Sequence, residues 1–140
     1  MCPMKSSRLV AMSVLLVVLG VGAVATSSSA TPVRQWAVVY LQEPTLIGST
    51  IVQGPVLFTH DEAKMARGEP CTTVQLFEPG EGPTESIASF HCVPRSRPVV
   101  NKFTLRTRPN VEDGIGCVLT EYQFAGDSEG HGVPAAGNAH

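Results

Sequence analysis

The sequence predicts an all-β fold: a small antiparallel β-sandwich or barrel with one short helix, after an N-terminal signal peptide. Two observations lead to this prediction. Beyond residue 30, short runs of β-branched and aromatic residues recur between Gly- and Pro-containing segments. Only the segment 61–67 combines helix-forming residues with a capping residue and a following glycine. We therefore expect a signal peptide over residues 1–30, a single β domain over 31–125 and a flexible C-terminal tail over 126–140.

The first 30 residues have the pattern of a secretory signal. Lys5 and Arg8 form a short positive region, an apolar run follows from 9 to 25, and small residues lead up to Ala30. We expect cleavage after Ala30 or, as a second choice, after Ala25, so that the protein is exported to the periplasm or the extracellular space. The alternative is an uncleaved anchor, because about 17 apolar residues is the lower limit for crossing a bilayer. After cleavage we expect no stable membrane insertion.

The charge of the exported part narrows the choice of partners. Without the leader, the chain keeps eight basic and twelve acidic side chains. A weakly acidic domain without a basic stripe does not favour nucleic acid or anionic lipid as a partner. We therefore expect no nucleic-acid binding, and a ligand from the envelope or from outside the cell whose identity the sequence does not give.

The predicted strands follow one another at short intervals. The first is expected to end before Pro44, because proline lacks the N–H that a central ladder needs. The next two are expected to form a hairpin around Gly54-Pro55. Later runs alternate polar and apolar residues, as half-buried strands do. In chain order, the expected strands are 34–42, 46–52, 56–60, 71–77, 86–92, 99–107 and 116–124.

The predicted helix is barely two turns long, so packing rather than propensity must stabilise it. Asp61 is expected to cap its first turn, and Gly68 to end it. Met65 is the residue that we expect to face the core, since methionine fills irregular gaps well.

Two cysteines flank a predicted hairpin whose loop is rich in Gly, Pro and Glu. If Phe77 lies opposite Ser86, the antiparallel register places Cys71 opposite Cys92. An oxidising compartment favours disulfides, so we expect a Cys71–Cys92 disulfide, with Cys117 left as a free or intermolecular thiol. The pairings Cys92–Cys117 and Cys71–Cys117 remain alternatives.

The chain also carries side chains that copper and zinc prefer. Their spacing matches no Cys-x-x-Cys or His-Glu-x-x-His motif. Each has an ordinary structural alternative: the cysteines can pair, Met65 can fill the core, and His60 can hydrogen-bond the turn. The candidate metal ligands are His60, Met65, Cys71, His91 and His131, with Cys92 added when it is not in a disulfide.

The segment 121–134 resembles the last strand and ligand loop of cupredoxins, in which Tyr-x-Phe-x-Cys leads to Pro-Gly-His and then Met. Ala125 stands where that motif has its cysteine, and no methionine follows His131, so a blue-copper site is not expected. The exported part also resembles small exported bacterial proteins, through its His60-Asp61 and Pro70-Cys71 dipeptides. This second resemblance implies a β domain outside the cytoplasm and carries no activity with it.

The function predicted from the sequence is therefore a disulfide-stapled β domain that acts as a binding or structural module of the cell envelope. The alternative is a periplasmic copper- or zinc-binding protein; apart from these metals, no cofactor is expected. A hydrolase-like enzyme is a third hypothesis. We predict no catalytic residue, because Cys92 and the adjacent His91 would project to opposite faces of a strand and no Gly-x-Ser-x-Gly motif is present.

Overall fold

The computed structural model describes residues 33–112 and 114–135. The predicted signal peptide and the end of the predicted tail, residues 136–140, lie outside these residues. The described part is mostly β with one short helix, which confirms the predicted fold class. In chain order, the elements are β1 (Arg34–Ile47), β2 (Thr50–Asp61), α1 (Glu62–Ala66), β3 (Thr72–Glu78), β4 (Gly82–Phe90), β5 (Val93–Ser96), β6 (Thr104–Pro109), β7 (Cys117–Gln123) and β8 (Glu129–Gly132).

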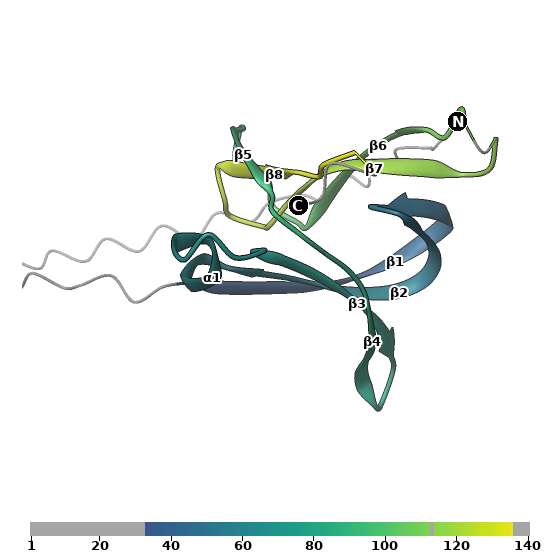
Figure 1. Cartoon of the computed structure of the whole chain (residues 1–140), viewed down its shortest axis with the longest axis horizontal. Helices are drawn as coiled ribbons and strands as arrows, with labels where there is room; N and C mark the ends of the chain where they lie inside the picture. Colours follow the sequence, from purple (N-terminus) through teal and green to yellow (C-terminus); the bar gives the residue numbers. More distant parts are fainter. Residues whose placement is uncertain (1–32, 113, 136–140) are drawn as a thin grey trace, which may run out of the picture.

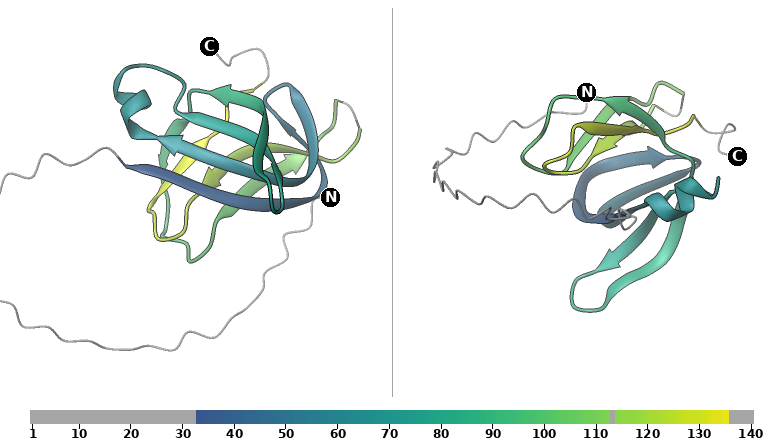
Figure 2. Two further views of the ribbon diagram at one scale, coloured as in Figure 1. Left: turned by 90° about the horizontal axis from the view of Figure 1, so that it is seen from below. Right: turned by 90° about the vertical axis from the view of Figure 1, so that its left-hand side faces the viewer.

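The strands form one open sheet that curls into a half-barrel (Figures 1 and 2). Their order is β4-β3-β2-β1-β7-β8-β5, and β6 also pairs with β7. Neighbours are antiparallel except β1 and β7, which run parallel over a short stretch where Thr45 and Leu46 face Cys117 and Val118. This short ladder joins the β1–β4 part of the sheet to the β5–β8 part, and Figure 1 shows the two parts facing each other.

Aromatic rings fill much of the space between the two parts of the sheet. Phe58 from β2 contacts Phe103 and Tyr122, whose rings contact Phe124 in turn, with centroids 5.2–6.1 Å apart. Pairs of this kind contribute about 0.5–1.5 kcal/mol each beyond the area they bury. The alternation along β1 places a second set of apolar side chains outside, because Trp36, Val38 and Tyr40 are exposed.

The first hairpin turns earlier than predicted. β1 continues through Pro44, and the register shifts between Leu41 and Thr45, which marks a bulge where proline is tolerated. The turn lies at Gly48-Ser49, where Gly48 has a φ of 63° that favours glycine. Gly54-Pro55, the predicted turn, instead lies within β2.

Residues 129–132 form β8, within the segment that the sequence predicted to be a flexible tail. The strand is held by pairing on both edges, with β7 and with β5. Its glycines, which made the segment look like a tail, have a packing role. A Cβ at Gly130 would lie 2.2 Å from Glu121 Oε1. Residues 126–135 are therefore part of the folded domain, which corrects the tail prediction there.

The short helix follows β2 directly. Asp61 is its N-cap, and the carboxylate accepts hydrogen bonds from the backbone N–H groups of Ala63 (2.9 Å) and Lys64 (3.2 Å). Gly68, with a φ of 72°, follows the C-cap. Met65 is 40% exposed and α1 buries no residue, so the expectation that Met65 anchors the helix in the core is wrong. Within the described residues, no helix has both the length and the apolar character to cross a membrane.

A buried carboxylate links the strands of the β5–β8 part. Glu121 on β7 pairs with Arg97 (2.6 Å) and Arg106 (3.0 Å), while Arg95 lies 4.0 Å away. Arg97, followed by the other arginines, lowers the pKa of Glu121, so this carboxylate remains ionised.

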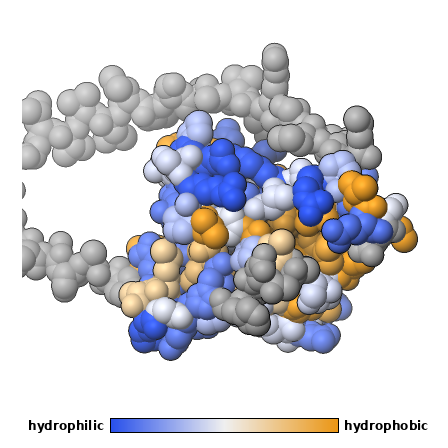
Figure 3. Space-filling model, turned by 45° about the horizontal axis from the view of Figure 1, so that its top comes forward, coloured by the Kyte–Doolittle hydropathy of each residue, from blue (hydrophilic) through white to orange (hydrophobic). Residues whose placement is uncertain are grey.

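In Figure 3, which views this part obliquely from above, hydrophilic side chains gather in the upper part of the face and apolar ones at its right-hand side.

Candidate metal centre

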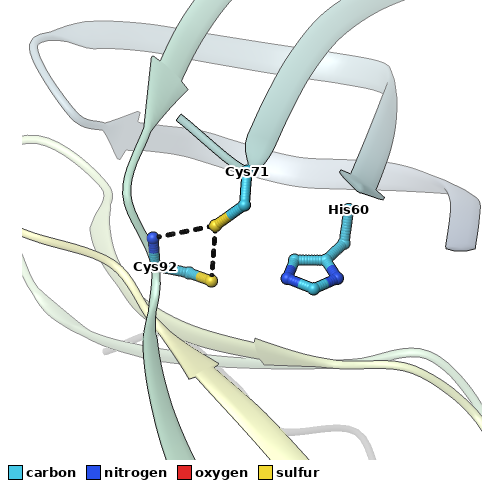
Figure 4. Close-up of side chains that lie close together, drawn as sticks. All are labelled: His60, Cys71 and Cys92. Carbon is cyan, nitrogen blue, oxygen red and sulfur yellow. Dashed lines mark hydrogen bonds between the residues drawn. The ribbon is translucent and has the colours of Figure 1, made fainter. Parts of the chain in front are cut away.

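Two cysteine thiols meet just beyond the end of the β3–β4 ladder. Cys71 immediately precedes β3, and Cys92 lies between β4 and β5. Their Sγ atoms are 2.8 Å apart, and the Cys92 N–H donates a hydrogen bond to Cys71 Sγ at 3.3 Å (Figure 4). Both residues are buried. The sequence therefore predicted correctly that these two residues come together.

The bond between them was predicted wrongly. A disulfide has an S–S length of about 2.05 Å, whereas here the sulfurs are 2.8 Å apart and both cysteines are free thiols. The predicted register is also wrong by one residue, because Thr72 pairs with Phe90 and Thr73 with Ser89. The loop between β3 and β4 is a tighter turn than expected, and the register of the β3–β4 ladder shifts between Val74 and Phe77.

An imidazole lies beside the two thiols. His60, near the end of β2, is 2% exposed, and neither of its ring nitrogens has a hydrogen-bond partner among the described residues. One of these nitrogens and the sulfurs of Cys71 and Cys92 all lie within 4.8 Å of one another. Figure 4 shows the ring edge-on to the thiols, with one nitrogen directed towards Cys92. Burial lowers the pKa of His60, so its ring is neutral at neutral pH.

A second imidazole borders the same group. His131 on β8 is 1% exposed, and its Nδ1 lies 3.6 Å from Cys92 Sγ and 3.7 Å from Glu129 Oε1. Its Nε2 has no partner in the described part of the chain. The His131 and His60 ring centroids are 4.3 Å apart. Burial, helped by His60, lowers the pKa of His131 to about 4.

Aromatic residues fix the position of the second imidazole. The Tyr122 ring stacks on His131 with centroids 4.9 Å apart and planes inclined by 21°, and Phe124 meets the same ring edge-on at 6.0 Å. The Tyr122 hydroxyl is hydrogen-bonded to the Thr72 hydroxyl next to Cys71. No sequence signal predicted this role of Tyr122, because the alternation along its strand indicates only that the side chain can be buried.

The Cys92 thiol is protonated in the metal-free group. Burial, followed by the neighbouring Cys71, raises the pKa of Cys92 to about 12. A thiol in this state is a poor nucleophile at neutral pH. The group therefore brings two buried thiols and two neutral imidazoles together with no cation among them. This is the ligand chemistry of a thiophilic metal ion rather than that of an activated nucleophile.

The structure brings some of the predicted ligands together and separates others. His60 and Cys71 form one group with Cys92, and His131 borders this group through its contact with Cys92. Met65 lies on the exposed side of α1, and His91 is half-buried outside the group.

Cys117 on β7 belongs to another part of the fold, with its sulfur 3.4 Å from Glu43 Oε2.

The comparisons with known proteins add no relative. No protein-family model, curated protein or solved structure matches the chain. The fold and the site define a small curled-sheet β domain with a buried dithiol–imidazole group.

Proposed function

We propose that this chain is an exported β domain that binds one thiophilic metal ion, zinc or copper(I), and acts as a structural or binding module of the cell envelope. The observation that carries the proposal is the buried group of His60, Cys71 and Cys92, whose ligand atoms lie within 4.8 Å of one another. Both ring nitrogens of His60 lack a protein partner in the described structure. A buried unsatisfied polar group costs about 1–3 kcal/mol, and a metal ion would offset that cost.

The surroundings suit coordination by thiolates. Metal binding requires deprotonated cysteines and neutral histidines, and burial already makes the His60 ring neutral. The Cys92 N–H that donates to Cys71 Sγ supports negative charge on that sulfur, as outer hydrogen bonds do in metal sites.

The burial of the ligands favours a structural role for the metal. His60, Cys71 and Cys92 are between 2% and 9% exposed. Closed sites of this kind contribute free energy of folding directly, whereas catalytic sites keep a position open for substrate. For a domain of this size, such a contribution would be a large share of the free energy of unfolding.

In an exported protein, metal binding would also protect the two thiols from oxidation. Two thiols 2.8 Å apart would be prone to oxidation in an oxidising compartment, and coordination would protect them.

The leader supports export, and N-terminal sequencing of the exported protein should begin at Thr31 or Thr26. Recovery of intact Met1 in the membrane fraction would contradict export.

The decisive experiment is metal analysis with a thiol count on protein purified without chelators from its native compartment. We expect about one equivalent of zinc or copper per chain, and its loss from the Cys71→Ser variant. His91→Ala is the matched control, because His91 neighbours Cys92 in sequence but lies outside the group. The His91→Ala variant should keep the metal. Metal-free protein whose melting temperature does not respond to added zinc or copper(I) would refute the proposal, as would a Cys71–Cys92 disulfide in non-reducing peptide maps.

A further inference from the structure

We infer that His131 is the fourth ligand, and that the centre is a closed Cys₂His₂ site for tetrahedral zinc which fastens the two parts of the curled sheet to each other. The inference rests on the metal-binding function proposed above. It goes further by naming the ion, its complete ligand set and its mechanical role.

The position of His131 fits a shared tetrahedral ion. Zinc lies about 2.3 Å from a cysteine sulfur and 2.0–2.1 Å from a histidine nitrogen, which places the two ligand atoms about 3.5 Å apart at a tetrahedral angle. The observed distance from Cys92 Sγ to His131 Nδ1 is 3.6 Å. By the same geometry, the two sulfurs would lie about 3.8 Å apart, so binding would separate Cys71 Sγ from Cys92 Sγ by about 1 Å from their present 2.8 Å.

The burial of His131 gives independent support. The side chain is 1% exposed, and its nearest polar contacts are Cys92 Sγ and Glu129 Oε1, while Nε2 has none among the described residues. Stacking on Tyr122 holds the ring in this place. A buried histidine held by an aromatic ring against a thiol has the ligand type, access and orientation that a structural zinc site needs.

The four ligands come from both parts of the sheet. His60 and Cys71 belong to the β2–β3 side, whereas His131 lies on β8, beside the chain that runs through Cys92 into β5. Along the first hairpin, His60 pairs with Gln35, at the end of β1 remote from Thr45, where β1 pairs with β7. The zinc would therefore connect the two parts at the end of the hairpin that the β1–β7 ladder does not reach.

Four ligands of this kind also discriminate between metals. A tetrahedral set of two sulfurs and two nitrogens is typical of zinc. Cobalt(II) is the useful probe, because it occupies tetrahedral zinc sites and its spectrum reports both sulfur ligation and coordination number. The expected spectrum of the cobalt-loaded full-length protein has thiolate charge-transfer bands and intense tetrahedral d–d bands.

The test compares the wild type with His131→Gln, using His91→Gln as the matched control. His131→Gln should keep the thiolate bands, lose the intensity of the tetrahedral bands, and bind zinc at least about 100-fold more weakly. His131→Cys should restore a tetrahedral spectrum with stronger thiolate bands, and His91→Gln should match the wild type. X-ray absorption of the zinc-loaded wild type should show two sulfur and two imidazole ligands, which decides the ligand set even if a variant fails to fold.

The possible failures are distinguishable. A wild type that binds neither cobalt nor zinc refutes the metal-binding function and this inference with it. A wild type that binds with thiolate bands, but whose spectrum and zinc affinity do not change in His131→Gln, refutes only the fourth ligand. An X-ray absorption spectrum with a single imidazole ligand would have the same meaning.

Discussion

Replacing His60 by leucine should stabilise the metal-free domain and destabilise the metal-loaded one relative to wild type. The reason lies in the two ring nitrogens, which are buried and have no hydrogen-bond partner among the described residues. Leucine has a similar volume and no polar atom, so it removes the cost of burying unsatisfied groups. It also removes a metal ligand.

The two effects have magnitudes that can be estimated. Unsatisfied buried groups cost about 1–3 kcal/mol, and a hydrophobic replacement of similar volume costs less than about 1.5 kcal/mol in imperfect packing. We therefore expect the metal-free His60→Leu variant to be more stable by about 1 kcal/mol, or roughly 4–8 °C in melting temperature. Free metal at about 1,000 times the wild-type Kd would stabilise the wild type by about 4 kcal/mol, and a variant that binds about 100-fold more weakly by only about 1.4 kcal/mol. The order of stability should then reverse.

The assay is thermal unfolding of both proteins in chelator and in excess zinc, with thiols kept reduced. His91→Leu is the control, because it makes the same replacement at a half-buried histidine outside the group. It should respond to zinc as the wild type does. The reasoning would be refuted if His60→Leu were less stable than wild type in chelator, or if zinc raised its melting temperature as much as it raises that of the wild type.

Three further predictions concern other parts of the fold. Arginine pairing lowers the pKa of Glu121, so its stabilising contribution is present above the unfolded value of about 4.3 and is lost as the pH falls through the lower folded value. Glu121→Gln should therefore lower the free energy of unfolding by about 2 kcal/mol at pH 7, less than for a fully buried pair because the arginines reach water. In urea unfolding, the difference in stability between wild type and variant should narrow below about pH 4. A difference independent of pH would contradict this. Gly116→Ala should lower the free energy of unfolding by roughly 3 kcal/mol or more, since φ at Gly116 is 70° and a Cβ would lie 1.8 Å from the Pro44 carbonyl oxygen. Gly114→Ala, at a φ of 65° and with open space around it, should lower it by only about 1 kcal/mol. Equal losses would locate the effect in backbone strain alone. Because burial raises the pKa of Cys92 to about 12, this thiol in reduced, metal-free protein should react with iodoacetamide far more slowly at pH 8 than in the unfolded chain; rapid reaction would revive the hypothesis of an enzyme.

Local signals in the sequence account for what was predicted correctly. Alternation and turn residues predict a β domain, and Asp61 with Gly68 places the one short helix. The predicted proximity of Cys71 and Cys92 is confirmed because both lie just beyond a short ladder, where an error of one residue in register still leaves them adjacent.

What the sequence could not give depends on distant pairing. Gly130 and Gly132 lower the strand propensity of β8, and the strand forms because β7 and β5 pair with it on both edges. His131 was therefore predicted as a candidate ligand but within a tail. Met65 was named on its chemistry alone, and the helix that carries it has no buried face.

The pairing of β8 also determines the order in which the domain can be completed. Among the described strands, β5 pairs only with β8, which is the last of them to leave the ribosome. Until Glu129–Gly132 has been synthesised and has docked on β7, β5, which directly follows Cys92, has no partner strand among the described residues, and such long-range pairing forms slowly. A chain shortened before Glu129 would keep its first hairpins but leave β5 without a neighbour. In the proposed zinc site, complete ligation would then mark a chain that had been both synthesised and folded as far as β8.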